Sequence, residues 1–212
     1  MAVGRGPDLA ARPVLIVASG PSLDPSDISL ARQSGFFVIA CNDNFVHDPD
    51  LLYAPDLTWI QHYKPEHPNR WTCLERTGSK IADWNEIPIE AVSQGLSKHA
   101  GSIANHGHAG AQMLSLAVQI FGAKRVALTG YDMQPTGGKT RWKGLHPEGV
   151  ERGDGEKYLK WRDSLQGMAA ELVSLGVEVV NCTRETALQC FPREPLESVI
   201  QRWTELCDRL AG

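Results

Sequence analysis

The hydrophobic pattern of the chain alternates between short, fully apolar runs and longer segments with helical spacing. Residues 14–17 and 36–40 are apolar throughout, whereas residues 25–33 between them are largely polar. An apolar run that stops at Gly or Pro is typical of a strand buried on both faces, and a strand, a helix and a strand in succession place the two strands in parallel. We therefore predict strands over residues 14–19 and 36–40, joined by a helix over residues 25–33.

The same alternation resumes in the second half of the chain. Residues 110–121 are apolar nearly all round a helix, which predicts a buried helix that ends at Gly122. The other expected elements are a short strand at 51–53, a turn or short helix at 56–63, strands at 125–129 and 177–181, and helices at 156–175 and 195–210. Residues 64–102 contain several prolines and no strong periodicity, so we expect loops and short pieces there.

Together these elements predict an α/β fold, a Rossmann-like, mostly parallel sheet with helices on both faces. The chain has 212 residues, of which 42% are hydrophobic and 22% charged, and it can therefore bury the core of a single domain. That domain, over residues 1–212, is expected to include the irregular middle region and a lid-like loop at 136–155. Residues 1–12 carry no such pattern and are the one part expected to be disordered.

Composition and charge argue against several classes of protein. No apolar stretch approaches the ~18 residues that cross a bilayer, and the N-terminus has no apolar signal core, so we expect a cytoplasmic protein without a membrane span. The five cysteines are widely spaced and include no CxxC pair, which argues against a disulfide framework or a structural zinc site. A formal net charge of −4 argues against an extended nucleic-acid surface.

The turn after the first strand is the most informative motif. The apolar run stops at Ser19, Gly20, Pro21 and Ser22. In α/β proteins ligands bind at such strand ends, and Gly20 lets the backbone approach a ligand while the amides and hydroxyls of Ser19 and Ser22 point beyond the strand. The motif predicts a phosphate site. The alternative is an ordinary turn that leads into a helix capped by Ser22 or Asp24.

Two further strand ends carry polar side chains. Asn42 and Asn44 follow the second strand, and their amides could contact a base, ribose or phosphate or satisfy backbone groups of the loop. Gly130, Tyr131 and Asp132 follow the strand at 125–129. Asp132 could bind a ribose hydroxyl or a metal ion, or cap the next turn. We interpret these positions as a second and a third edge of the same ligand site.

A loop rich in cations follows the third of these strand ends. It carries Lys139, Arg141, Trp142, Lys143 and His146. Cations and an aromatic ring within a flexible segment suit a lid that closes over a phosphate and stacks on a ring. A solvated surface hairpin is the structural alternative.

Histidines are the candidates for a general base, because transfer to a hydroxyl needs a proton removed near neutral pH. His146 in the loop is the first candidate and His106 the second. His108 stands close to His106 and directly before the buried helix, so either ring could face the ligand or cap that helix. The His-x-His pair also suggests a metal site, but no third ligand stands nearby, and we assign no metal.

These motifs, taken in order, resemble a known family. The turn at 19–23, the segment Cys41, Asn42, Asp43, Asn44 and Phe45, and the Gly130, Tyr131, Asp132 sequence are similar to the bacterial sialyltransferases of glycosyltransferase family 42. They are equally similar to a related group that includes 6-hydroxymethylpterin diphosphokinase and many phage proteins. The resemblance implies that Gly20, Pro21, Ser22 and Asn42 contact the nucleotide of a donor and that a histidine is the base. The sequence around His146 does not match the sialyltransferase motif.

The function that this resemblance implies is transfer from an activated nucleotide donor, a CMP-sugar or another nucleotide sugar, to a hydroxyl acceptor. Its expected partners are that small-molecule donor, which is the substrate rather than a cofactor, and a glycan, small molecule or modified nucleic acid as acceptor. An ATP- and Mg²⁺-dependent diphosphate transferase, with Asp132 near the metal, is the first alternative. A nucleotide-binding protein without catalysis is the second, and a homo-oligomer is left open.

Overall fold

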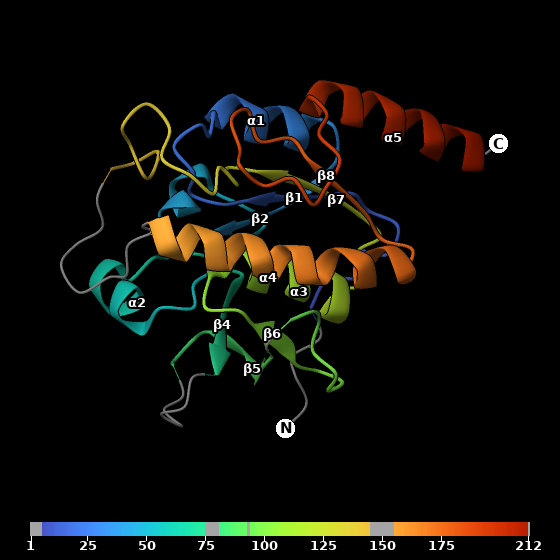
Figure 1. Cartoon of the computed structure of the whole chain (residues 1–212). Coiled ribbons are helices and arrows are strands. Elements are labelled where there is room, and N and C mark those ends of the chain that lie inside the picture. Colours follow the sequence, from blue (N-terminus) through green and yellow to red (C-terminus); the bar gives the residue numbers. More distant parts are fainter. Residues whose placement is uncertain (1–5, 75–80, 93, 145–154, 212) are drawn as a thin grey trace.

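Eight parallel strands form one sheet in the computed structural model, which describes residues 6–74, 81–92, 94–144 and 155–211 (Figure 1). The strands are β1 (Val14–Val17), β2 (Phe37–Cys41), β3 (Leu51–Tyr53), β4 (Arg70–Leu74), β5 (Asn85–Ala91), β6 (Ile103–Asn105), β7 (Arg125–Thr129) and β8 (Glu178–Asn181). Their order across the sheet is β6-β5-β4-β3-β2-β1-β7-β8. This arrangement confirms the predicted α/β, Rossmann-like fold.

The predicted helices are all present. The helical elements are α1 (Pro25–Gln33), the 3₁₀ helix η1 (Asn42–His47), α2 (Leu57–Tyr63), α3 (Ala109–Ser115) with the π-helical turn η2 (Leu116–Ile120), α4 (Gly155–Ser174) and α5 (Leu196–Ala211). Helix α1 begins where Asp24 Oδ1 accepts the amide of Ser26 at 2.9 Å, a cap that satisfies a free N–H of the first turn. The helix that continues through η2 ends before Gly122, which adopts a φ of 74°.

Helices cover both faces of the sheet. Figure 1 shows α1 and α5 together on one side and α3 and α4 on the other. Alternate residues of β1 divide in the same way: Val14 and Ile16 belong to the core under α3 and α4, whereas Leu15 and Val17 belong to the core under α1 and α5. A strand buried on both faces has no polar side, which explains the continuous apolar runs.

The middle region is more regular than expected. The segment at 64–102 was expected to hold loops and short pieces, but it contains β4 and β5. Pro88 is the last residue of β5 paired with β4, and Ile89 is the first paired with β6. The missing N–H of the proline therefore lies where the strand changes partner, which is how a proline is accommodated within a sheet.

The order of the strands reverses at β1. From β1 the chain continues through α1 to β2 on one side, while β7, from the second half of the chain, pairs with β1 on the other side. In open α/β sheets the crevice at such a reversal, outside the carboxyl ends of the strands, is the usual ligand site. The turns after β1, β2 and β7 all meet there.

Of residues 1–12, which were expected to be disordered, residues 1–5 lie outside the described residues, and residues 6–12 contact the rest of the domain. The amide of Leu9 donates to Phe121 O at 2.8 Å, and the Leu9 side chain is buried. Arg12 donates to the carbonyl oxygens of Gly35 and Phe36. Among the helices that the structure describes, none combines the length and apolar character needed to cross a membrane.

Candidate functional site

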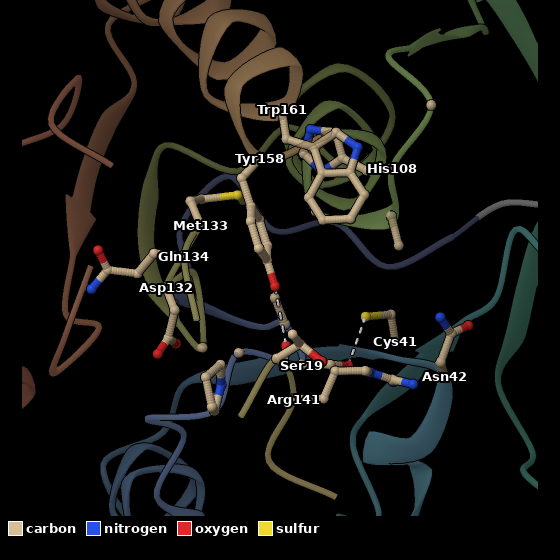
Figure 2. A pocket seen from close by; sticks show the side chains of 18 of the residues that line it. Ser19, Cys41, Asn42, His108, Asp132, Met133, Gln134, Arg141, Tyr158 and Trp161 are labelled. Carbon is tan, nitrogen blue, oxygen red and sulfur yellow. Dashed lines mark hydrogen bonds between the residues drawn. The ribbon is translucent and has the colours of Figure 1, made fainter. Parts of the chain in front are cut away.

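A cavity of about 200 Å³ lies at the reversal point of the sheet. Figure 2 shows Tyr158 reaching from α4 toward Ser19 and Arg141, with Trp161 and His108 close together beside it. The residues that line the cavity come from the turns after β1, β2, β3 and β7, the start of α3, the loop after β7 and the start of α4. Among them are Ser19, Gly20, Pro21, Cys41, Asn42, Asp56, His108, Gly130, Asp132, Arg141, Tyr158 and Trp161.

The turn after β1 forms part of the cavity wall, but its amides are used inside the protein. The amide of Gly20 donates to Gly130 O at 2.8 Å, and the amide of Ser22 donates to Asp132 Oδ2 at 2.9 Å. A Cβ at Gly20 would overlap Asp132 Oδ1 and lie 2.5 Å from Gly130 O. Ser19 and Pro21 line the cavity, whereas Ser22 does not. The expectation that the amide of Ser22 points toward a ligand is therefore wrong.

Asp132 fastens the turn after β1. Its Oδ2 accepts hydrogen bonds from the amide of Ser22 and from Thr136 Oγ1, each at 2.9 Å. Asp132 is 1% exposed, and burial raises the pKa of its carboxyl group although these two hydrogen bonds act in the opposite direction. Asp132 therefore caps the turn with Oδ2, while its Oδ1 is buried without a described partner in a residue that lines the cavity and is available to a ligand.

Arg141 brings a buried positive charge to the opposite wall. Its side chain is 11% exposed, and Nη2 pairs with Asp43 Oδ2 at 3.1 Å. No described residue accepts a hydrogen bond from Nη1, although this atom is buried. Burial lowers the pKa of the guanidinium while Asp43 raises it. A buried donor without a partner is costly, so this group suits an acceptor supplied by a ligand.

The two asparagines after β2 differ in role. Asn42 lines the cavity in the left-handed conformation, with φ at 49°, and its buried Oδ1 has no partner in the described part of the chain. Asn44 is fully buried, and its Nδ2 lies 3.2 Å from Ala18 O and 3.3 Å from Ser19 Oγ. Asn44 therefore holds the end of β1, the structural alternative considered for it, while Asn42 remains a ligand candidate.

Two other predicted ligand residues lie away from the cavity. Tyr131 is fully buried, and its hydroxyl donates to Gly110 O at 2.9 Å. Lys139 is exposed at the end of a short hairpin in which Thr136 and Lys139 exchange backbone hydrogen bonds. Neither residue belongs to the cavity lining. The loop is thus a surface hairpin at its tip and a cavity wall at Thr140 and Arg141.

The histidines give no base at the cavity within the described residues. His106 Nε2 lies 2.8 Å from Gly95 O, and His106 is not part of the lining. His108 caps α3 by accepting the amide of Ala111 on Nδ1 at 3.3 Å, and its Nε2 lies 2.9 Å from Ser164 Oγ. Burial lowers the pKa of His108 to about 3, so the ring is neutral. His146 lies outside the described residues.

The lining also includes residues that were not predicted as site residues, among them Asp56, Tyr158, Trp161 and Cys41. Tyr158 and Trp161 of α4 contact each other edge to face at 5.5 Å, and Trp161 lies 5.4 Å from the His108 ring. Both aromatic residues lie within the helix predicted at 156–175, and helical periodicity alone does not separate a core face from a cavity wall. Cys41 also lines the cavity, but burial raises the pKa of its thiol to about 11, so it is not an activated nucleophile.

No protein-family model matches this sequence, and no curated protein matches it either. The geometry of the cavity is therefore the basis for inferring a function. That geometry combines one buried guanidinium, two unpartnered oxygens, Oδ1 of Asn42 and Oδ1 of Asp132, and the aromatic rings of Tyr158 and Trp161. In the part of the chain that the structure describes, no group of three or more His, Cys, Asp or Glu side chains is arranged to hold a metal ion.

Proposed function

We propose that the protein is a transferase that binds an activated nucleotide donor in this cavity, as a glycosyltransferase does. The observation that carries the proposal is the Nη1 of Arg141, a buried donor that lines the cavity and has no partner among the described residues. Guanidinium groups bind phosphate through directed hydrogen bonds with full charge. The phosphate of the donor would supply the missing acceptor and stabilise Arg141 in return.

The place of the cavity supports the same proposal. It lies at the carboxyl ends of β1 and β7, where the strand order reverses, and this is where α/β sheets bind nucleotides. Asn42 offers an acceptor for a ligand N–H or O–H, and Trp161 offers a ring on which a base can stack. These groups match the two chemical parts of a nucleotide, one charged and one aromatic.

The size of the cavity limits how much of the ligand it encloses. Its volume of about 200 Å³ lies below the ~300–1,000 Å³ of pockets that bury a drug-sized molecule. A nucleotide sugar would therefore place only its nucleotide part inside. The transferred group would lie at the mouth, where an acceptor hydroxyl can reach it.

The test is a thermal-shift panel of CMP, CDP, UDP, GDP and ATP, each with and without Mg²⁺. A ligand that binds only the folded protein stabilises it by about 2.7 kcal/mol at a hundred times its Kd. We expect stabilisation by a pyrimidine nucleotide without metal. Stabilisation by ATP only when Mg²⁺ is present would instead support the diphosphate transferase, and no response to any nucleotide would overturn the proposal.

Two substitutions in one loop test the role of Arg141. Arg141→Lys keeps a positive charge beside Asp43 but loses the fork of donors, and we expect it to weaken nucleotide binding roughly tenfold or more. Lys139→Ala, in the exposed hairpin, is the matched control and should leave affinity unchanged. Equal losses in both variants would mean that the loop attracts the ligand by net charge and not through Arg141.

A further inference from the structure

Asp56 is a cavity residue whose carboxylate is only half used by the protein. It follows β3 and caps α2: its Oδ1 accepts the amides of Thr58 at 2.8 Å and Trp59 at 3.2 Å. No hydrogen bond or ion pair to Oδ2 is present among the described residues, although Asp56 lines the cavity. One oxygen thus fixes the side chain, and the other is free for a ligand.

The cap of α1 shows that an aspartate at a helix N-terminus does not in general keep its second carboxylate oxygen free. Asp24 also accepts an amide on Oδ1, from Ser26 at 2.9 Å. Its Oδ2, however, pairs with Arg184 at 3.1 Å. Asn and Ser cap helices about as well as Asp, so capping alone does not require a carboxylate at position 56.

The free oxygen of Asp56 belongs to the same contact network as Arg141. Arg141 pairs with Asp43, whose Oδ1 accepts the indole N–H of Trp59 at 2.9 Å. The amide of Trp59 in turn donates to Asp56 at 3.2 Å. A chain of three contacts therefore fixes a carboxylate and a guanidinium relative to each other on one cavity.

A carboxylate and a guanidinium that line the same cavity select among phosphorylated ligands. The carboxylate repels a phosphate, so the phosphate of a ligand belongs at Arg141 and a hydrogen-bond donor belongs at Asp56. The neighbouring donors in a nucleotide are the ribose hydroxyls. Carboxylates accept from hydroxyls in strong, charge-assisted hydrogen bonds.

We propose that Asp56 binds the ribose hydroxyls of the nucleotide and makes the site selective for ribonucleotides over their deoxy counterparts. The inference rests on the proposed function, because it needs a nucleotide in the cavity. It adds Asp56 as a ligand-binding residue, and it adds a selectivity for ribose that neither the turn after β1 nor Arg141 supplies.

The experiment compares CMP, UMP, AMP and GMP with their 2′,3′-dideoxy counterparts by titration calorimetry in EDTA. For the monophosphate that the unmodified protein binds, we expect the dideoxy form to bind roughly ten- to a hundredfold more weakly. Asp56→Ser keeps an oxygen for the cap of α2 and removes the second carboxylate oxygen. We expect it to bind both forms equally, at the affinity of the dideoxy form.

Asp24→Ser is the matched control, since it makes the same change at a helix cap outside the cavity. It should retain the preference for ribose. If the preference for ribose survives in Asp56→Ser, Asp56 does not bind the ribose hydroxyls. The same conclusion follows if the preference is lost equally in Asp24→Ser. In both cases the proposed function stands. A preference that appears only with added Mg²⁺ also overturns it, because Asp56 would then act through a cation. Failure of every nucleotide to bind overturns both proposals together.

Discussion

The two walls of the cavity treat their polar groups differently. The first wall comprises residues 19–21, Gly130 and Asp132, and there the amide of Gly20 and Oδ2 of Asp132 already have partners in the protein, whereas Asp132 Oδ1 is buried without a described partner. The second wall comprises Asn42, Asp56 and Arg141, and it keeps two buried polar atoms, Asn42 Oδ1 and Arg141 Nη1, without a described partner. The backbone of the first wall therefore shapes the site, and the second wall offers most of the polar groups that a ligand can use.

Polar residues at a strand end are therefore not equivalent to ligand residues. Buried polar groups must find partners, and the protein itself supplies them wherever the backbone allows. Asp132 Oδ2 and Asn44 Nδ2 have such partners in the neighbouring turns, whereas Oδ1 of each residue has none among the described residues. Only the groups that remain unsatisfied after folding indicate what a ligand must bring.

The largest expected change in the free energy of unfolding concerns His108, a residue of the cavity lining whose two ring nitrogens both form hydrogen bonds. Its pKa is about 3 in the folded protein and about 6.5 in the unfolded chain, so the unfolded chain binds the extra proton between these values. Stability supplied by the neutral ring is therefore complete above pH 6.5 and is lost as the pH falls toward 3. The expected loss is about 1.4 kcal/mol per pH unit below 6.5.

Urea unfolding of the protein and of His108→Asn, measured from pH 7 to pH 4, isolates this contribution. Asn preserves a cap for α3 but does not titrate, so its free energy of unfolding should fall less steeply with acid. Parallel pH profiles for the two proteins would show that His108 is not held neutral.

The next largest effect is expected for Gly20→Ala in the first wall. The added Cβ would overlap Asp132 and lie 2.5 Å from the backbone oxygen of Gly130, so the turn must move. We expect a loss of about 2–4 kcal/mol in the free energy of unfolding, measured by urea denaturation. Gly155→Ala is the control, since a Cβ there meets no atom within 4 Å and should leave stability unchanged or slightly higher. A Gly20→Ala variant as stable as Gly155→Ala would contradict the close packing of Gly20 against Asp132 and Gly130.

The smallest effect on stability is expected for Asn42→Gly in the second wall. Glycine adopts the φ of 49° without strain, so the free energy of unfolding should change by less than about 0.5 kcal/mol. Nucleotide affinity should nevertheless fall several-fold, because the unpartnered Oδ1 is removed. Calorimetry on the nucleotide identified by the thermal-shift panel measures this loss. An unchanged nucleotide affinity would mean that Asn42 serves only the left-handed backbone conformation of the turn and does not bind the ligand.

The sequence predicted the parts of the fold that are apolar in a continuous run. Strands β1, β2, β3, β7 and β8 follow such runs or nearly such runs, and the helices between them follow from spacing and glycines. Strands β4 and β5 were missed because Arg70 and Pro88 interrupt the pattern, and β6 was missed because its three residues form too short a run. A strand that changes partner in its middle shows no periodicity of its own, and its place depends on neighbours far along the chain.

Prediction of the site was more limited. The predicted residues that do line the cavity are Ser19, Gly20, Pro21, Asn42, Gly130, Asp132 and Arg141. Tyr131 and His106 were predicted as well, but their polar atoms bond to Gly110 and Gly95 instead. Residue type reveals a capacity for hydrogen bonding, whereas the choice between a ligand and a backbone carbonyl is made by the packing of other elements.

The pairing of β1 with β7 has a consequence for the order in which the molecule is made. Ser22 and Asp132, which close the turn, are separated by 110 residues, and Val14 lies opposite Val126. During synthesis on the ribosome, β1 and β2 emerge long before β7 and the turn after it, which form the other side of the crevice. Contacts between such distant residues form slowly because a long loop must close first. The cavity therefore cannot form until the chain has been synthesised through β7 and the start of α4, which supply part of its lining.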